Sequence, residues 1–217
     1  ATLILSPFFK EVIMLRKINL TCIAIFFSIF LFGCTKSENN NGTVSKPSRH
    51  AILVEGTGTY SRKITTDSVL AQKFFDQGLR YAWAFHFPES IASYQQAAVH
   101  DPSHPMIYWG MAHAIGPNPN SRYSRMPDDP KGEGLKAINK AVSLIENANP
   151  IEQEMITALH ILYDKESISD DNLRDIAYME AADVLLQKYP SDPDIVSLYA
   201  ESYMNIGRWD YWEKDGT

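Results

Sequence analysis

The stretch AQKFFDQGLRYAWAFHFPESIASYQQAAVHDPSH, residues 71–104, decides the fold of this chain. Aromatic and small residues recur in it three or four positions apart, which places them on one side of a helix. The residues that carry this pattern are Phe74, Gly78, Tyr81, Ser90, Tyr94, Ala97 and Pro102. Rings of this size fill the space between two antiparallel helices, small residues let the backbones approach, and a proline ends the second helix. The stretch therefore predicts two helices joined by a short turn.

The spacing resembles the tetratricopeptide repeat (TPR), a helix pair with aromatic and small residues at fixed positions. Only Gln77 departs from the pattern, which has a leucine at that place. The resemblance implies an all-α fold, a TPR-like solenoid of about three and a half irregular helix pairs. Such a fold is a scaffold, and a scaffold does not reveal its ligand.

Helical patterns continue along the rest of the chain. Ser68 and its two preceding neighbours offer N-caps for the first helix, and Pro88 is tolerated in the first turn of the second. Gly116 ends a third helix, and a long loop then runs to Pro130. Loops of that length in compact domains are usually functional or disordered. We expect the TPR-like domain to cover residues 66–217.

The N-terminal segment has the layout of a bacterial lipoprotein signal. An apolar block at residues 20–32 follows Arg16 and Lys17. It is too short for the roughly 20 apolar residues that span a bilayer as a helix. The sequence LFGC at residues 31–34 resembles the lipobox of bacterial lipoproteins, so Cys34 is the expected lipidation site. The alternative is a membrane anchor that is never cleaved.

These features divide the chain into four segments. Residues 1–13 are interpreted as translated upstream sequence, because Met14 begins the basic part of the signal. Residues 14–33 form the predicted signal peptide, and residues 34–65 a tether with an extended segment. The predicted location is the bacterial cell envelope, with a lipid anchor in the outer membrane facing the periplasm or the exterior.

Composition and motifs argue against several classes of function. The formal net charge is −6 at pH 7, so we expect no nucleic-acid partner. Both cysteines, Cys22 and Cys34, lie in or next to the signal segment, so no disulfide is expected. We find no paired carboxylates on one helix face, no nucleophile with a base and no glycine-rich phosphate loop. The sequence predicts no catalytic residues and no cofactor.

Several motifs together resemble uncharacterised TPR-domain proteins of bacteria, which are often envelope proteins. The motifs are ITT at residues 64–66, AQ-x₂-FDQGL at 71–79, DP at 101–102, M-x-YWG-x-A at 106–112, GPN-x-N at 116–120, YAE-x₂-MN at 199–205 and WD-x₂-W-x₂-DG at 209–216. Family members continue into further helix pairs with histidine-rich motifs, so the resemblance implies that this chain is an N-terminal fragment. Members commonly show Phe-Asn-His where this chain has Phe85-His86-Phe87, which leaves the role of this histidine open. The family has no agreed activity.

TPR-like packing predicts a concave groove lined by the first helix of each pair. The side chains expected there are Phe75, Leu79, Trp109, His113 and Met155, which could grip a peptide or a small apolar ligand. The alternative is that these residues only pack between helices.

The long loop offers a second candidate site. Asn118, Asn120, Arg122 and Arg125 could contact an acidic or sugar ligand, and the alternative is a solvated insertion.

Four histidines are candidates for a metal site, because imidazole binds copper, zinc and iron. They are His100, His104, His113 and His160. No HExxH or CxxC motif accompanies them, so we expect no metal site here.

Three functions remain open on the sequence. The first is a lipid-anchored TPR scaffold that binds a protein or peptide partner in the envelope. The second is an outer-membrane lipoprotein that captures a glycan or peptide nutrient. The third is the N-terminal part of a metal-dependent or redox protein whose site lies further along the natural chain.

Overall fold

The computed structural model describes residues 51–120, 123–124, 127–207, 209–212 and 214–216. These residues form seven α-helices and two short 3₁₀ turns, and they contain no β-strand. The all-α prediction is therefore confirmed for the described part of the chain. The chain divides into two units, residues 1–47 and 48–217, and the first unit lies outside the described residues.

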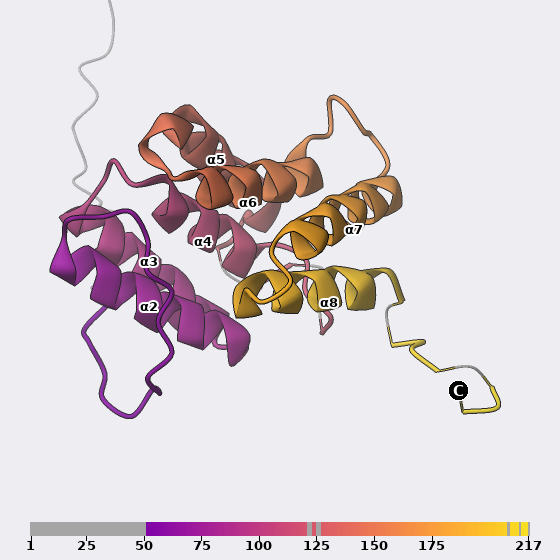
Figure 1. The fold of residues 1–217 in the computed structure, drawn as a ribbon, viewed down its shortest axis with the longest axis horizontal. Coiled ribbons are helices and arrows are strands. Elements are labelled where there is room, and N and C mark those ends of the chain that lie inside the picture. Colours follow the sequence, from indigo (N-terminus) through magenta and orange to yellow (C-terminus); the bar gives the residue numbers. More distant parts are fainter. Residues whose placement is uncertain (1–50, 121–122, 125–126, 208, 213, 217) are drawn as a thin grey trace, which may run out of the picture. The chain divides into compact units, whose positions relative to one another are not determined.

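Each helix packs against the next one along the chain (Figure 1). The helices are α2 (Val69–Trp83), α3 (Phe87–His100), α4 (Pro105–Ile115), α5 (Pro130–Ser143), α6 (Pro150–His160), α7 (Asp171–Lys188) and α8 (Pro193–Gly207). The 3₁₀ turns follow α5 at Ile145–Asn147 and α6 at Ile161–Tyr163. Helix α4 also contacts α2 and α6, so these three helices lie in one row.

Prolines and short polar side chains set the points where the helices begin. Ser68 caps α2, because its hydroxyl accepts a hydrogen bond from the N–H of Ala71 at 3.2 Å, as the sequence predicts. Helix α6 begins with a capping box in which Asn149 and Glu152 bond each other's main-chain N–H groups. Four helices start at a proline, whose missing N–H is not needed in the first turn. These prolines are Pro105, Pro130, Pro150 and Pro193.

Helices α2, α3 and α4 meet around the ring of Tyr94, which is fully buried. A Cβ atom placed at Gly78 would lie 2.9 Å from this ring, and one at Gly110 only 2.5 Å from it. Neither position therefore has room for a side chain while the ring stays in place. The hydroxyl of Ser90 donates to the carbonyl oxygen of Gly78 at 2.7 Å, which joins α3 to α2.

A second tyrosine packs on glycines between α4, α5 and the turn after α6. A Cβ atom at Gly134 would lie 2.5 Å from the buried ring of Tyr163, and one at Gly116 would lie 2.8 Å from its hydroxyl. That hydroxyl donates to the carbonyl oxygen of Ala112 at 2.7 Å. Close backbone packing on a tyrosine therefore occurs twice in this fold.

The remaining residues of the repeat pattern lie on or next to the first two helices. Phe74 stacks on His100, with ring centroids 5.6 Å apart. Ala97 is fully buried, Tyr81 is half-buried near the end of α2, and Pro102 follows α3 on the surface.

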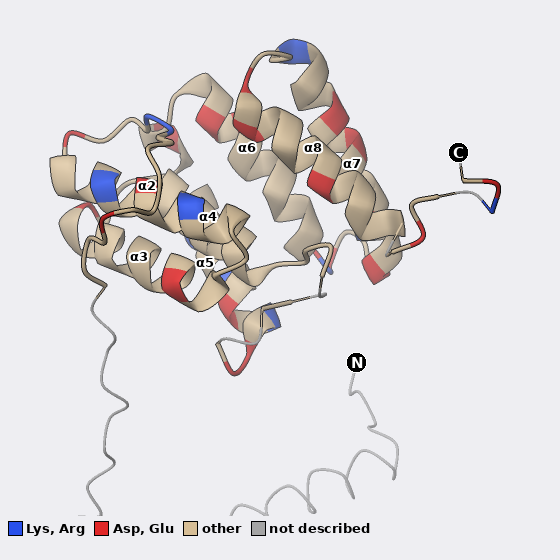
Figure 2. Cartoon of the chain, turned by 90° about the horizontal axis from the view of Figure 1, so that it is seen from below, with Lys and Arg blue, Asp and Glu red and all other residues tan. Residues whose placement is uncertain are grey.

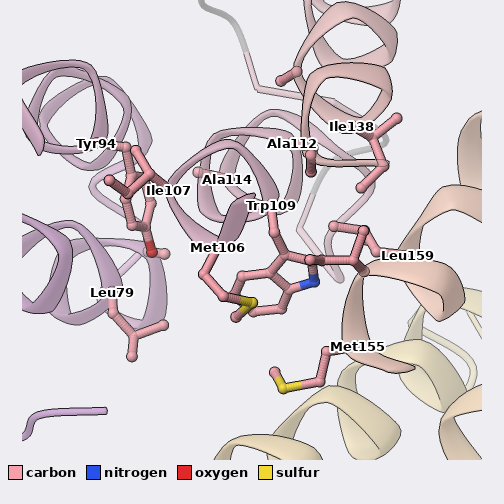
Figure 3. Packing of buried hydrophobic residues seen from close by; sticks show 14 of the residues in the cluster. Leu79, Tyr94, Met106, Ile107, Trp109, Ala112, Ala114, Ile138, Met155 and Leu159 are labelled. Carbon is pink, nitrogen blue, oxygen red and sulfur yellow. The ribbon is translucent and has the colours of Figure 1, made fainter. Parts of the chain in front are cut away.

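The hydrophobic core continues from α4 into α5 and α6. The ring of Trp109, only 1% exposed, lies among Ile138 of α5 and Leu159 and Met155 of α6 (Figure 3). This packing connects three helices through a single large side chain.

Aromatic side chains stay exposed at the C-terminal end of the described residues. Tyr203 is 62% exposed and Trp212 is 73% exposed. They line a hollow of about 800 Å³ together with Ile176 and Met179 of α7.

Several predictions concern segments that the structure does not describe. Cys34, the signal segment at residues 14–33 and the residues before it lie outside the described part, as do Arg122 and Arg125. Among the described residues, no helix combines the length and the apolar character needed to cross a membrane.

Candidate functional site at the N-terminal strap

Residues 51–66, here called the strap, pack along α2 before the chain enters that helix (indigo in Figure 1). Gln77 on α2 holds the first part of the strap with both atoms of its amide. Its Oε1 accepts from the N–H of Val54 at 2.8 Å, and its Nε2 donates to the carbonyl of Ile52 at 2.9 Å. The same Nε2 donates to the hydroxyl of Ser93 on α3 at 3.0 Å. The residue that departs from the repeat pattern thus binds the strap.

Gln72 and Arg80 lie two turns apart on α2 and hold the later part of the strap. Gln72 accepts from the N–H of Ile64 at 3.0 Å and donates to the carbonyl of Arg62 at 2.8 Å. Arg80 donates to the carbonyl of Tyr60 at 2.7 Å. Helix α2 therefore holds the strap largely through main-chain groups of the strap.

Asp76 lies between these two residues and is buried. It accepts hydrogen bonds from the hydroxyl of Ser61 at 2.7 Å, from the N–H of Arg62 at 3.2 Å and from Nε2 of Gln72 at 2.9 Å. Burial raises the pKa of Asp76 above its usual value, although these hydrogen bonds act in the opposite direction.

The side chain of Arg62 reaches from the strap to the last helix pair. Its Nη1 donates to Oδ1 of Asp192 and to Oδ2 of Asp194, each at 2.8 Å. Its Nη2 lies 3.1 Å from the sulfur of Met155 on α6. The Arg62 side chain is 9% exposed and that of Asp194 is 3% exposed. We call the three residues around this guanidinium, Met155, Asp192 and Asp194, the arginine pocket.

The two carboxylates of the arginine pocket favour a positive charge. Burial disfavours the charged guanidinium, but hydrogen bonds and charges from Asp192 and Asp194 outweigh it and raise the pKa of Arg62. The hydroxyl of Tyr60 donates to Asp194 at 2.8 Å, and burial together with this carboxylate raises the pKa of Tyr60. Asp192 also caps α8, because it accepts from the N–H groups of Asp194 and Ile195 at 3.0 and 3.2 Å.

The C-terminal end of the strap is bound to α6. Thr65 donates through its N–H and its hydroxyl to the two carboxylate oxygens of Glu152, at 3.0 and 2.9 Å. The neighbouring Ile64 is buried in the core. This end of the strap is therefore fixed by both polar and apolar contacts.

A second polar group joins α4 to α8. Nε2 of His113 lies 2.8 Å from a carboxylate oxygen of Glu201. The His113 ring stacks on Trp109 at 5.4 Å between centroids and lies 5.3 Å from the ring of Trp83. Burial lowers the pKa of His113, but the charge and hydrogen bond of Glu201 and the charge of Asp194 outweigh it, so this pKa is raised.

Helix α8 also contacts the turn after α4. Asn205, one turn beyond Glu201, donates to the carbonyl oxygen of Pro117 at 3.4 Å. Asn118 is buried, and its Oδ1 accepts from the N–H of the exposed Asn120 at 3.0 Å. The motifs GPN-x-N and YAE-x₂-MN therefore meet in the fold through Pro117 and Asn205, which are 88 positions apart.

The residues predicted to line a groove lie in the hydrophobic core. Phe75 and Leu79 are fully buried, and Trp109 and Met155 are nearly so. His113 is buried as well and is paired with Glu201. Their placement corresponds to the packing alternative, and contact with a ligand would require these side chains to become uncovered.

The four histidines are distributed over separate contacts. His100 stacks on Phe74, and His104 caps α4, since its Nδ1 accepts from the N–H of Met106 at 3.2 Å. Burial lowers the pKa of His104, in contrast to His113. His160 is half-buried at the end of α6. Among the described residues, no three His, Cys, Asp or Glu side chains are grouped to hold a metal ion.

Sequence reasoning assigned no binding role to Arg62, Gln72, Asp76 or Asp194. One signal was available, because polar residues at positions 72, 76 and 80 share a face of a helix whose other positions are largely apolar. The partners of Arg62 lie 130 and 132 residues away, which no local pattern reveals.

Three comparisons with known proteins found no match: no protein-family model, no curated protein and no solved structure is similar to this chain.

Proposed function

We propose that this protein is a lipid-anchored, TPR-type scaffold of the bacterial cell envelope that binds an extended segment of a protein partner. In this proposal α2, α4, α6 and α8 are the first helices of successive pairs. The residues that hold the strap come from α2, α6 and the start of α8. The binding face is therefore the one that the strap crosses.

One observation carries the proposal: α2 already holds an extended polypeptide by its main chain. The amides of Gln72 and Gln77 each accept from one strap N–H and donate to one strap carbonyl. Any extended segment presents the same groups, and main-chain recognition of this kind gives affinity that does not depend on a particular side chain.

The proposed anchor rests on the sequence LFGC at residues 31–34. Several acyl chains on one cysteine give stable membrane attachment, whereas one chain alone is marginal. We expect the wild-type protein in the membrane fraction of cells and Cys34→Ala outside it. An unchanged membrane-bound amount of Cys34→Ala would contradict the lipid anchor.

Site-specific photocrosslinking in cells tests the partner. A photoreactive residue is placed at Arg80 on α2, which contacts the strap, at Trp83 beside His113, or at Val184, which is exposed on α7. We expect the first two positions to give crosslinks to the same envelope protein and Val184 to give none. Equal crosslinking at all three positions, or at Val184 alone, would contradict a binding face at the strap.

A further inference from the structure

We propose that the arginine pocket recognises an arginine side chain on an extended segment of a partner protein, and that the strap occupies this site as an exchangeable internal ligand. The inference rests on the proposed function and names the chemistry of the partner. It is carried by the contacts of Arg62 and by the way the strap is attached.

The pocket has the geometry of a guanidinium site. Nη1 of Arg62 contacts both oxygens of Asp192, at 2.8 and 3.0 Å, and one oxygen of Asp194 at 2.8 Å. Nη2 lies against the polarizable sulfur of Met155. Nη1 alone makes all three carboxylate contacts. A guanidinium is more weakly hydrated than the compact ammonium of lysine, so it loses less hydration on entering a buried pocket lined by two carboxylates and a sulfur. The pocket therefore favours arginine over lysine.

The pocket is built by parts of the fold other than the strap. Asp192 is held by its capping bonds to the first turn of α8, and Met155 lies in the middle of α6. Removal of Arg62 would leave the nearly buried Asp194 without its cation, which is costly in a protein interior. The site therefore keeps its attraction for a guanidinium when the strap leaves.

The strap is attached in a way that permits exchange. Within the part of the chain that the structure describes, no main-chain to main-chain hydrogen bond joins residues 51–63 to a helix. Ile52, Leu53 and Val54 are exposed, so little apolar area holds this end. Segments with few buried contacts open at lower free energy than the core of a protein. Ile64 and Thr65 anchor the far end, so the strap can open from its N-terminal side.

Native-state hydrogen exchange on the full wild-type chain tests this opening. The N–H groups of Val54 and Arg62 are bonded to side chains of α2. We expect both to exchange by local opening, faster than the slowest amides of α2 and α4. Exchange of these two amides only through global unfolding would overturn the proposal.

Peptide binding tests the recognition of arginine. The probe is a fluorescent peptide of residues 54–63, compared with the same peptide carrying Arg62→Lys. We expect the full-chain variant Arg62→Ala to bind the arginine peptide about tenfold tighter than the lysine peptide. Wild type should bind it about tenfold more weakly than the variant, or weaker still, because affinity falls with the fraction of molecules whose strap is released.

Lys63→Ala is the matched control, because Lys63 is the exposed neighbour of Arg62 and should leave wild-type binding unchanged. Equal binding of the two peptides, no binding to Arg62→Ala, or equal binding to variant and wild type would overturn the proposal. If Arg62→Ala does not fold, hydrogen exchange of the wild-type chain is measured with and without an excess of the arginine peptide. Faster exchange at Val54 supports displacement of the strap, and unchanged exchange overturns it.

Three further outcomes identify the occupant of the pocket and separate this proposal from the proposed function. A concentration-dependent dimer joined by exchanged straps, detected by light scattering and strap crosslinks, would identify a second copy as the occupant and overturn the assignment to a partner. Arginine-selective binding without envelope crosslinks at Arg80 and Trp83 would refute the proposed scaffold function and leave the pocket standing. Crosslinks without arginine selectivity would support the proposed scaffold function and refute the recognition of arginine by the pocket.

Discussion

The contact around Tyr94 joins three successive helices, whereas the ion pairs of the arginine pocket join segments at least 130 residues apart, and the two regions use different physical means. Tyr94 fits against Gly78 and Gly110 without any charged group, so the contact depends on volume. The arginine pocket depends on one guanidinium and two carboxylates, with acidic residues prominent along α7 and α8 (Figure 2).

The difference predicts which changes each region tolerates. Close-packed interiors respond to the addition of a single methyl group, because neighbouring atoms cannot move far. A buried charge responds to the loss of its partner, because the remaining charge has no solvent to replace it. The first region should therefore be sensitive to side-chain size, and the second to the loss of a charge.

The largest effect is expected for Arg62→Ala. The substitution leaves the nearly buried Asp194 without its ion-pair partner, and breaking such a pair costs about 3 kcal/mol of unfolding free energy or somewhat more. Urea denaturation followed by tryptophan fluorescence measures the loss. Lys63→Ala should stay within about 0.5 kcal/mol of wild type. Equal urea midpoints for the two variants would mean that the pocket does not stabilise the fold.

The next effect is expected for Gly110→Ala. Its new methyl group would lie 2.5 Å from the ring of Tyr94, so overpacking should cost about 2 kcal/mol even though alanine favours helices. Gly207→Ala is the control, since its methyl group meets only the exposed ring of Tyr211 at 3.1 Å. The same urea titration should show little change for Gly207→Ala. A similar loss for both glycines would refute the volume argument.

Gly78→Leu should also destabilise the protein, by ~1 to 3 kcal/mol, because its Cβ would lie 2.9 Å from the same ring. An unchanged urea midpoint would contradict close packing of α2 on α3.

A smaller, pH-dependent effect is expected at His113. Its pKa in the folded protein is raised, so its contribution to stability is complete below the unfolded value of about 6.5 and is lost as the pH rises through the folded pKa. The difference in unfolding free energy between wild type and His113→Gln should therefore shrink with rising pH, by ~1.4 kcal/mol for each unit by which the pKa is raised. His104, whose pKa is lowered, contributes to the pH dependence of stability in the opposite direction. Because His104 is present in both proteins, its contribution cancels in the difference between wild type and His113→Gln.

Urea titrations at a series of pH values between about 5.5 and 9 check this trend. A difference between wild type and His113→Gln that stays constant over the range would show that Glu201 does not favour protonated His113.

The smallest effect is expected for Tyr203→Ser. Tyr203 is largely exposed on α8, and substitutions at such positions usually change stability by less than about 0.5 kcal/mol. Thermal unfolding at two protein concentrations measures it. A larger loss that depends on concentration would reveal that this surface is covered by another molecule in solution.

The sequence predicts the helices of this fold better than its contacts. The cap at Ser68, the helix end at Gly116 and the all-α class follow from local chemistry, and each agrees with the structure. Ile145 continues the apolar spacing of Ile138 and Val142 but lies in a 3₁₀ turn, since α5 ends at Ser143.

The candidate site could be predicted only in part. His113 was identified, but its partner Glu201 lies 88 residues later, and no spacing rule connects two helices that far apart. Aromatic spacing identified Trp109 and Phe75 without distinguishing a groove from a core, since both environments select the same residue types. For the strap the sequence predicts only a tether with an extended segment. Its binding to α2 is missed because these bonds run through main-chain groups, which leave no signature in the sequence.

The bond from Tyr60 to Asp194 closes a loop of 134 residues, whereas most helix contacts in this fold join immediate neighbours along the chain. Closing a long loop costs entropy that is recovered only after both ends are in place, so local helix pairs form first. Contacts that form after the folding transition state affect the rate of unfolding and leave the rate of folding unchanged. The contacts of the arginine pocket, which would form late in folding, would then slow unfolding and lengthen the lifetime of the folded state.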